Sequence, residues 1–505
     1  MRLGWVLATA VTLVWAQEQP PVFQTGTRLV QVDVVVRDKS GAVVGLTKDD
    51  FRVTDNDKPQ TISVFSMRQV DAAPPPAVAL PPGVVTNRPQ ARGLEPVSAT
   101  VVLMDRQNTY PEDQASARIQ ALKYLDHAKR NEQIALYELG TTLKVLQQFT
   151  DDRDLLYKAM DKSKMESSFN MMDSLEGGLL TGLKGNAAQE TRRNAQQRRN
   201  AITSAAFATI ARQLEGLPGR KKLIWITAAL PLHFTQDTER NLVASNEYND
   251  MTPQLFKAMK MLNDGNVALY PLDPRGVFPG VLSDEGVETM IRLADLTGGK
   301  AFYADNGLAE NLEEAIADTD VSYTLGYYVN EEVQDGAFHN IRVTVARSGA
   351  DVRYRRGYSA TQARKPLTER QRKGTLSDWV VEPLDATGLA VRAQARRIAN
   401  RPGYYSVEVM VDPAELQLEH KGNHWVGAFD VAIVPNKGTR PKGLEQRIKV
   451  NLTQEGYVRA LTAGIVVANP IRAADAKGKL IAPELKVVVM DEVNGKAGAV
   501  RIPVK

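Results

Sequence analysis

The chain has 505 residues, a formal net charge of +4 and no cysteine. This length suggests about three domains and supplies enough apolar residues for sizeable cores. The lack of cysteine excludes disulfides, thiolate nucleophiles and cysteine-ligated metals. Lysine and arginine are spread along the chain, so the small net charge gives no support to a nucleic-acid-binding role.

The first residues have the pattern of a targeting segment. Residues 1–16 begin with a basic Met1-Arg2 pair and continue as an apolar run that ends at Ala16. This pattern is typical of a secretory signal peptide, and it is too short for a stable membrane anchor. No later stretch approaches the roughly 20 apolar residues of a transmembrane helix. We therefore expect an exported protein, periplasmic or extracellular, without a membrane span.

Residues 25–70 have the pattern of a small β module. Val30, Val32 and Val34 alternate with polar residues, which is the period of a half-buried strand. A module this small is marginal alone, so we expect it to dock on its neighbour. Residues 71–96 contain seven prolines and no periodicity, which predicts an extended linker.

Residues 97–360 alternate between strand-like and helix-like patterns. This alternation predicts an α/β fold with a doubly wound, mostly parallel sheet that is covered on both faces. The strand-like runs are 100–105, 133–139, 142–149, 222–228, 267–272, 300–304 and 322–329. The helical patterns are marked by Ile119, Leu122 and Leu125, by residues 287–294, which follow a predicted N-cap at Ser283, and by residues 308–316. Residues 165–200 read as a surface insertion that leads into a long helix ending near Gly216.

Residues 375–505 return to strand patterning. Apolar residues alternate with polar ones around 389–395, 405–411 and 485–489, and turns separate these runs. Many short strands of this kind predict a β-sandwich.

The sequence contains no recognisable catalytic motif. There is no phosphate loop, dinucleotide fingerprint or nucleophile elbow. His420 and His424 are four residues apart, but Lys421-Gly422-Asn423 between them predicts a turn between strands rather than a zinc-binding helix. His127, His233 and His339 look isolated along the chain. We therefore expect no enzyme activity and no catalytic residues.

With these patterns in place, the central region resembles a von Willebrand factor A domain. The whole is similar to exported bacterial proteins with a VWFA-related domain, of the kind abundant in acidobacteria. The segments that carry this resemblance are residues 30–65, 101–109, 217–225, 270–276 and 356–358. The C-terminal sandwich is predicted from patterning alone.

The resemblance implies a metal-ion-dependent adhesion site at the sheet edge. In that family, an Asp-x-Ser-x-Ser loop and an aspartate after a later strand supply oxygens to Mg²⁺. Here the loop reads Asp105-x-Gln107-x-Thr109, and Ala228 stands where the later aspartate is expected. A distant threonine also contributes in the family, and Thr181 is the candidate. Because Mg²⁺ gives up its water reluctantly, loss of a carboxylate predicts a degenerate site with weak Mg²⁺ binding or none.

Three roles for Asp105 stay open: a polar residue that stabilises its own loop, a ligand of a weakly bound cation, or a direct contact to a partner. We predict that Asp105, Gln107, Asn108, Thr109 and Thr227 form the binding residues. The leading hypothesis is a non-enzymatic module that binds an unidentified protein of the cell envelope, without a cofactor. The alternatives are an envelope hydrolase with an unrecognised site and a structural spacer.

Overall fold

The computed structural model describes residues 27–69, 80–88, 99–109, 111–128, 132–163, 186–217, 219–228, 253–275, 284–303, 321–330, 338–360, 367–436, 443–474 and 479–504. The predicted signal peptide, Ser283, the predicted helix at 308–316 and Thr181 lie outside these ranges. So does most of the predicted insertion, since the description resumes at Asn186. No helix of the described ranges is both long and apolar enough to cross a membrane.

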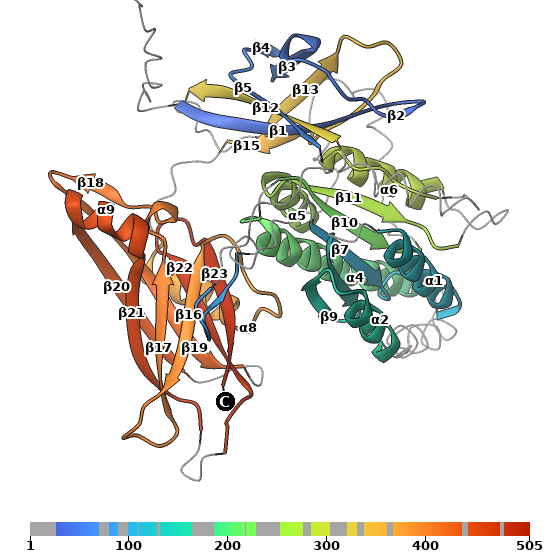
Figure 1. Cartoon of the computed structure of the whole chain (residues 1–505). Helices are drawn as coiled ribbons and strands as arrows, with labels where there is room; N and C mark the ends of the chain where they lie inside the picture. The colour runs from blue at the N-terminus through green and yellow to red at the C-terminus, as the bar shows by residue number, and fades with distance from the viewer. Residues whose placement is uncertain are drawn as a thin grey trace, which may run out of the picture.

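Figure 1 shows three parts: a β module, a central α/β domain and a C-terminal β domain. The predicted mixed α/β architecture is therefore confirmed. The elements of the β module are β1 (Thr27–Asp38), β2 (Gly41–Ala42), η1 (Lys48–Asp50), β3 (Phe51–Asp55), β4 (Lys58–Gln60), β5 (Val64–Gln69), β12 (Val321–Asn330), β13 (Phe338–Val345), β14 (Asp351–Arg353) and β15 (Gly357–Ser359). They form two sheets, in the orders β14-β1-β12-β5 and β15-β13-β3-β4, with β2 paired to β1.

This β module is built from chain segments that precede the central domain in the sequence and from others that follow it. Residues 322–329 were predicted as a strand of the central sheet, but β12 instead pairs antiparallel with β1 and β5. Its inward side chains, Tyr323, Leu325 and Tyr327, are fully buried among the valines of β1. The predicted boundaries of 25–70 and 97–360 therefore need correction, because the module also includes residues 321–330 and 338–359.

The central domain has a five-stranded sheet in the order β11-β10-β7-β8-β9. Its elements are β7 (Ala99–Asp105), α1 (Pro111–His127), β8 (Gln133–Leu139), β9 (Leu143–Thr150), α2 (Arg153–Lys162), α4 (Asn186–Leu214), β10 (Lys221–Ile226), α5 (Pro253–Asp264), β11 (Val267–Leu272) and α6 (Asp284–Thr297). The pairs β7–β8, β7–β10 and β10–β11 are parallel, and β9 is antiparallel to β8. Phe302 forms one further parallel bridge, to Leu272.

Strand β7 is buried on both of its faces. Leu103 packs in the cluster that contains residues of α4, α5 and α6, whereas Val102 packs in the cluster with α1 and α2. This double burial explains why the strand is a continuous apolar run. Ile119, expected on the buried face of its helix, is 51% exposed. Leu125 of the same predicted pattern is buried in the core as expected, together with Ala121 and Tyr124.

The C-terminal β domain contains β6 (Val85–Thr86), α8 (Glu369–Val381), β16 (Val391–Arg397), β17 (Tyr404–Val411), η4 (Pro413–Glu415), β18 (Glu419–Lys421), β19 (His424–Pro435), β20 (Leu444–Thr453), α9 (Gln454–Ala463), β21 (Ile465–Arg472), β22 (Glu484–Asp491) and β23 (Ala497–Pro503). One sheet has the order β21-β17-β16-β6, and the other joins β18, β19, β20, β22 and β23. Both sheets contribute to one shared core.

Two features of this domain differ from the sequence prediction. Helices α8 and α9 interrupt the expected all-strand pattern, and Thr368 and Thr453 cap their N-termini. Strand β6 lies in the segment 71–96, which was predicted to be only a linker. A two-residue strand leaves no periodicity to detect, so its pairing with β16 was not visible in the sequence.

Candidate functional site

Asp105 ends β7 at the carboxyl edge of the central sheet, where the sequence placed it. The residue is 2% exposed. Its Oδ1 accepts hydrogen bonds from the backbone N–H groups of Gln107 at 2.9 Å and Asn108 at 3.0 Å. Its Oδ2 accepts from Asn108 Nδ2 at 2.8 Å, Trp225 Nε1 at 2.9 Å and Thr227 Oγ1 at 3.2 Å. The carboxylate is therefore surrounded by donors.

These contacts use up the acceptor capacity of the Asp105 carboxylate. An ionised carboxylate has about four lone-pair sites, and here five donors converge on its two oxygens. Burial raises the pKa of Asp105, while the hydrogen bonds from Asn108, Trp225 and Thr227 oppose that rise. The loop therefore stabilises the carboxylate with donors, and the geometry leaves no oxygen directed toward a cation.

Trp225 holds the far side of this network. It lies in β10, is fully buried, and packs edge-on against Phe207 of α4 with ring centroids 5.1 Å apart. Because the ring is fixed by this packing, its N–H is aimed at Asp105 without further ordering cost. The sequence prediction missed Trp225, since the site motif contains no tryptophan and only the fold brings β10 beside β7.

Asn108 connects the loop to helix α4. Its Nδ2 donates to Thr203 Oγ1 at 3.0 Å as well as to Asp105. Thr203 is fully buried in the middle of α4. No local sequence signal marks this threonine. It is one of several hydroxyl residues on a long polar helix, and its role depends on how that helix packs against the sheet. Thr203 therefore supplies a hydroxyl from a distant part of the chain at this site.

Thr109 connects the loop after β7 to the residues that follow the neighbouring strand β10. Its Oγ1 accepts a hydrogen bond from the backbone N–H of Ala228 at 3.2 Å, and Thr109 is 1% exposed. Gln107 is half-buried, and its N–H also reaches the carbonyl of Leu139 at 3.1 Å. The structure thus brings all five predicted binding residues together. Four of them are buried, and Gln107 alone of the five reaches the surface.

The residues that follow β11, at the same edge of the sheet, form an ion pair. Arg275 Nη2 lies 2.7 Å from Asp273 Oδ2, and the same guanidinium donates to the carbonyl of Ala228. Asp273 is 1% exposed and also accepts from the backbone N–H of Arg275 at 3.0 Å, which fixes the turn after β11. Where the family resemblance expects a carboxylate, the chain therefore has Ala228 beside a neutralised ion pair.

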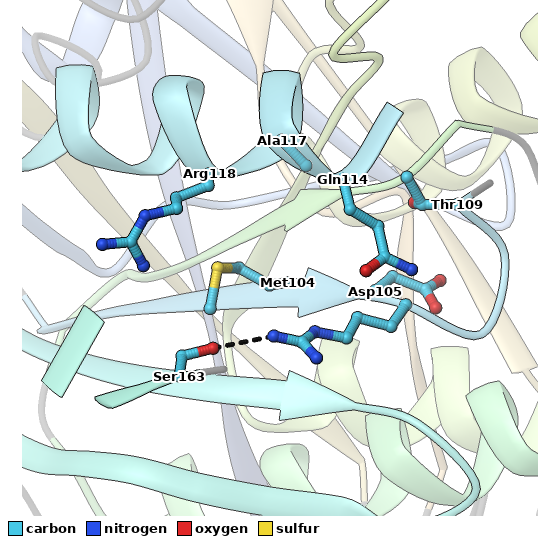
Figure 2. A pocket seen from close by; sticks show the side chains of 8 residues that line it. Met104, Asp105, Thr109, Gln114, Ala117, Arg118 and Ser163 are labelled. Carbon is cyan, nitrogen blue, oxygen red and sulfur yellow. Dashed lines mark hydrogen bonds between the residues drawn. The ribbon is translucent and has the colours of Figure 1, made fainter. Parts of the chain in front are cut away.

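A small cavity of about 20 Å³ lies beside Asp105 (Figure 2). Its lining residues are Met104, Asp105, Arg106, Thr109, Gln114, Ala117, Arg118 and Ser163. Arg106 pairs with Glu138 at 2.8 Å and donates to Ser163 Oγ at 2.9 Å. Gln114 Nε2 is buried without a protein partner. A cavity of this size holds about one water molecule, which would satisfy that amide.

The residues at this edge do not fit a magnesium ion. Mg²⁺ requires near-octahedral oxygen ligands, yet the Asp105 oxygens and Thr109 Oγ1 already accept protein hydrogen bonds. Across the described ranges, no group of three or more histidine, aspartate or glutamate side chains is placed to hold a metal.

No protein-family model matches the chain, and no curated protein matches it. Similar solved structures include an aerotolerance-related membrane protein from Bacteroides fragilis, with 15% identity, a TM-score of 0.26, and coverage of 43% of this chain and 98% of that one. BatB from Bacteroides thetaiotaomicron has 13% identity, a TM-score of 0.25, and coverage of 44% and 98%. A von Willebrand factor type A protein from Catenulispora acidiphila has 10% identity, a TM-score of 0.26, and coverage of 91% and 75%. At these low TM-scores the similarities carry no argument about function, and the chain is simply similar in structure to proteins that include a von Willebrand factor type A protein.

Proposed function

We propose that the chain is an exported, non-enzymatic protein-binding module of von Willebrand factor A type with a degenerate metal-ion-dependent adhesion site. The strand order β11-β10-β7-β8-β9, with helices on both faces of a mostly parallel sheet, supports the assignment of the central domain. The two sheets around a shared core support a sandwich class for the C-terminal domain. Export is inferred from the pattern of residues 1–16.

One observation carries the proposal of cation-independent binding. The Asp105 carboxylate accepts hydrogen bonds from five donors at 2.8–3.2 Å, so it serves its own loop rather than an ion. A carboxylate engaged in this way fixes the shape of the sheet edge. A partner would then contact the surfaces of the surrounding loops. Gln107 lies in one of these loops and is half-buried, so its side chain reaches the surface.

Two cavities in the described ranges support a binding rather than a catalytic role. The cavity beside Asp105 accommodates about one water molecule, which is too small for a substrate. A larger cavity of about 330 Å³ lies between α6 and β14. Its carboxylates are already paired, Asp295 with Arg356 and Asp351 with Arg353, each at 2.6 Å. Both carboxylates are therefore engaged in ion pairs at a junction between two modules, and neither is free to act as a general acid or base.

Titration calorimetry with Mg²⁺ and Mn²⁺ tests the metal part of this proposal. We expect no sub-millimolar binding to the wild-type chain. The matched variants are Asp105→Ala and Asp151→Ala, the second being an exposed acid outside the site. Binding that Asp105→Ala abolishes and Asp151→Ala retains would overturn the degenerate-site proposal.

The partner-binding part needs a separate measurement. Immobilised chain is exposed to envelope extract in the presence of Mg²⁺ and, in parallel, of EDTA. We expect the same partner to be captured in both conditions, and to be lost when Gln107 is replaced by a bulky charged residue. Failure to retain any partner in either condition would favour the structural-spacer alternative, and retention only with Mg²⁺ would refute cation independence.

A further inference from the structure

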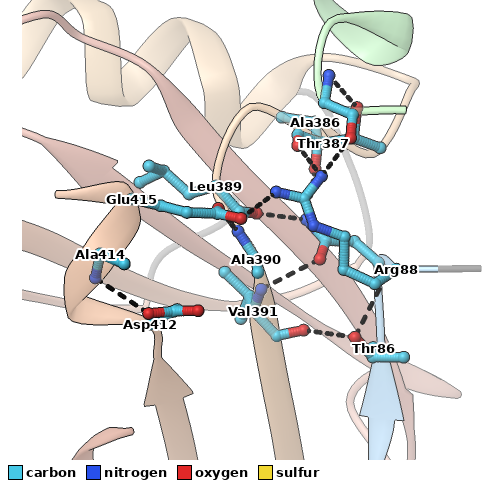
Figure 3. Close-up of polar contacts among 12 residues, drawn as sticks. Thr86, Arg88, Ala386, Thr387, Leu389, Ala390, Val391, Asp412, Ala414 and Glu415 are labelled. Atoms are coloured by element: carbon cyan, nitrogen blue, oxygen red, sulfur yellow. Dashed lines mark hydrogen bonds and ion pairs between the residues drawn. The ribbon is translucent and has the colours of Figure 1, made fainter. Parts of the chain in front are cut away.

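The segment 84–88 is bound by the C-terminal β domain as an extended peptide (Figure 3). In strand β6, Val85 pairs with Ala393 and Thr86 with Arg392 of β16. Thr86 Oγ1 also donates to the carbonyl of Val391 at 2.9 Å. This is strand addition to a sheet edge, a common mode of peptide recognition.

Both the nitrogen and the oxygen of the Asn87 side-chain amide form hydrogen bonds with the C-terminal β domain. Its Nδ2 donates to the carbonyls of Ala386 at 2.8 Å and Leu389 at 2.7 Å. Its Oδ1 accepts from the N–H of Val391 at 3.0 Å. Three hydrogen bonds to fixed backbone groups require an amide side chain of this length, because an acid lacks the donors and a shorter chain does not reach.

Arg88 completes the recognition. Its Nη2 pairs with Glu415 Oε1 at 2.5 Å, and its Nη1 donates to the carbonyls of Thr387 at 2.8 Å and Gly216 at 2.5 Å. The second oxygen of Glu415 accepts from the N–H of Ala390, so the carboxylate is held in position. The edge of β16, the backbone of residues 386–391, Gly216 and Glu415 together form this binding site, which we call the groove. Its contacts match a β-strand followed by asparagine and arginine.

We propose that this groove is a peptide-recognition site that a second copy of the chain can fill with its own segment 84–88, so that the protein self-associates by strand exchange. Ten residues separate Gln69 from Leu80, and ten separate Arg88 from Ala99. A fully extended stretch of ten residues spans at most about 33–36 Å, and this is the reach available on each side of the segment for exchange between two copies. Exchange replaces each contact by an identical one, so its cost in contacts is small.

A disulfide trap tests the exchange directly, because the natural chain has no cysteine. Thr86→Cys combined with Arg392→Cys places two thiols on directly paired residues. We expect mild oxidation to give a covalent monomer in dilute solution and a rising fraction of covalent dimer as the protein is concentrated before oxidation. The single variant Thr86→Cys is the control for non-specific cross-linking. A monomeric cross-link at every concentration would overturn the proposal.

A second measurement keeps the proposal testable if the cysteine variants fold poorly. Arg88→Ala weakens the resident segment, so the full-length variant should bind a labelled synthetic peptide of residues 82–91 about tenfold more tightly than the wild type does. Adding Glu415→Gln to Arg88→Ala should remove most of this gain, because the arginine of the incoming peptide loses its partner. Equal peptide binding by wild type and Arg88→Ala would contradict the proposed site.

Discussion

Trp225 Nε1 donates a hydrogen bond of 2.9 Å to Oδ2 of Asp105, and both side chains are buried. One of them belongs to β10 and the other to the end of β7, so the bond joins the two neighbouring strands at the carboxyl edge of the sheet. A hydrogen bond to a buried charged group contributes more to stability than one between neutral groups. This bond therefore links the stability of the central domain to the shape of the candidate site.

Replacing Trp225 by Phe should destabilise the protein by at least about 1.5–3 kcal/mol, because a donor to the carboxylate is lost and the smaller ring also leaves a gap in a fully buried position. The measurement is the free energy of unfolding in urea. Trp379→Phe is the control, since Trp379 donates at 3.2 Å to the carbonyl of Gly495 and is only half-buried. An equal loss of unfolding free energy in both variants would show that the bond to Asp105 contributes no more to stability than the bond of Trp379.

The stability contribution of Asp105 should depend on pH with a defined sign. Burial raises the folded-state pKa of Asp105 above its ordinary value of 3.8, so the folded state binds a proton more tightly than the unfolded state. Stability should therefore fall as pH rises from 3.8 through the raised folded-state pKa.

Unfolding in urea across this acidic range, for the wild type and Asp105→Asn, isolates that contribution. The wild type should lose stability relative to the variant as pH increases, because the amide does not titrate. A difference between the two proteins that grows in favour of the wild type with increasing pH would contradict the sign given above.

Lys222 and Glu132 form a buried ion pair near the other end of the central sheet. Lys222 Nζ lies 2.8 Å from Glu132 Oε1, and Tyr124 donates to the same oxygen at 2.8 Å. Lys222→Met should cost about 3–5 kcal/mol, because it leaves an unpaired buried carboxylate. The double variant Lys222→Met, Glu132→Leu should recover most of that loss. A double variant as unstable as the single one would show that packing, rather than charge, dominates there.

Thr203→Val should loosen the site loop without a large loss of packing. The substitution removes the hydroxyl that accepts from Asn108 Nδ2 at 3.0 Å and leaves a buried amide hydrogen without that partner. We expect a loss of about 1 kcal/mol and faster amide hydrogen exchange at Gln107 and Asn108. Thr209→Val on the same helix is the control, since its hydroxyl contacts Glu382 and not the loop. Unchanged amide hydrogen exchange in Thr203→Val would show that the contact with α4 does not stabilise the loop.

Gly216 should resist substitution by even one methyl group. A Cβ at this position would lie 1.6 Å from the carbonyl oxygen of Thr387, where α4 meets the C-terminal β domain. We expect Gly216→Ala to lower the free energy of unfolding and to expose this junction to proteolysis. Gly374→Ala is the opposite control, because its Cβ would meet nothing within 4 Å on the exposed face of α8. That control should gain roughly 0.5–1 kcal/mol.

The sequence predicted the local elements better than their assembly. The runs 133–139 and 267–272 coincide with β8 and β11, because a buried strand between turns leaves a clear local pattern. The run at 322–329 is also a strand, but its alternation cannot tell which sheet it joins. That choice depends on side-chain contacts with β1, where Val30 pairs with Tyr327 more than half the chain length away.

The candidate site shows the same division. The sequence placed Asp105 at the sheet edge, since a strand that ends in a carboxylate has a local signature. It could not identify Trp225 or Thr203 as partners, because these contacts arise only when β10 and α4 are packed. His339 looked isolated in the sequence, yet its Nδ1 lies 2.9 Å from Asp55 Oδ1. Long-range polar contacts of this kind leave no periodic trace.

The course of the chain through the β module constrains the order of events during synthesis. Gln69 of β5 pairs with Val321 of β12, and Phe51 of β3 pairs with Val345 of β13. The earliest strands therefore have open edges until the whole central domain has been made, and such edges are prone to misassociate. The first module to be synthesised is therefore the one whose sheets are completed late.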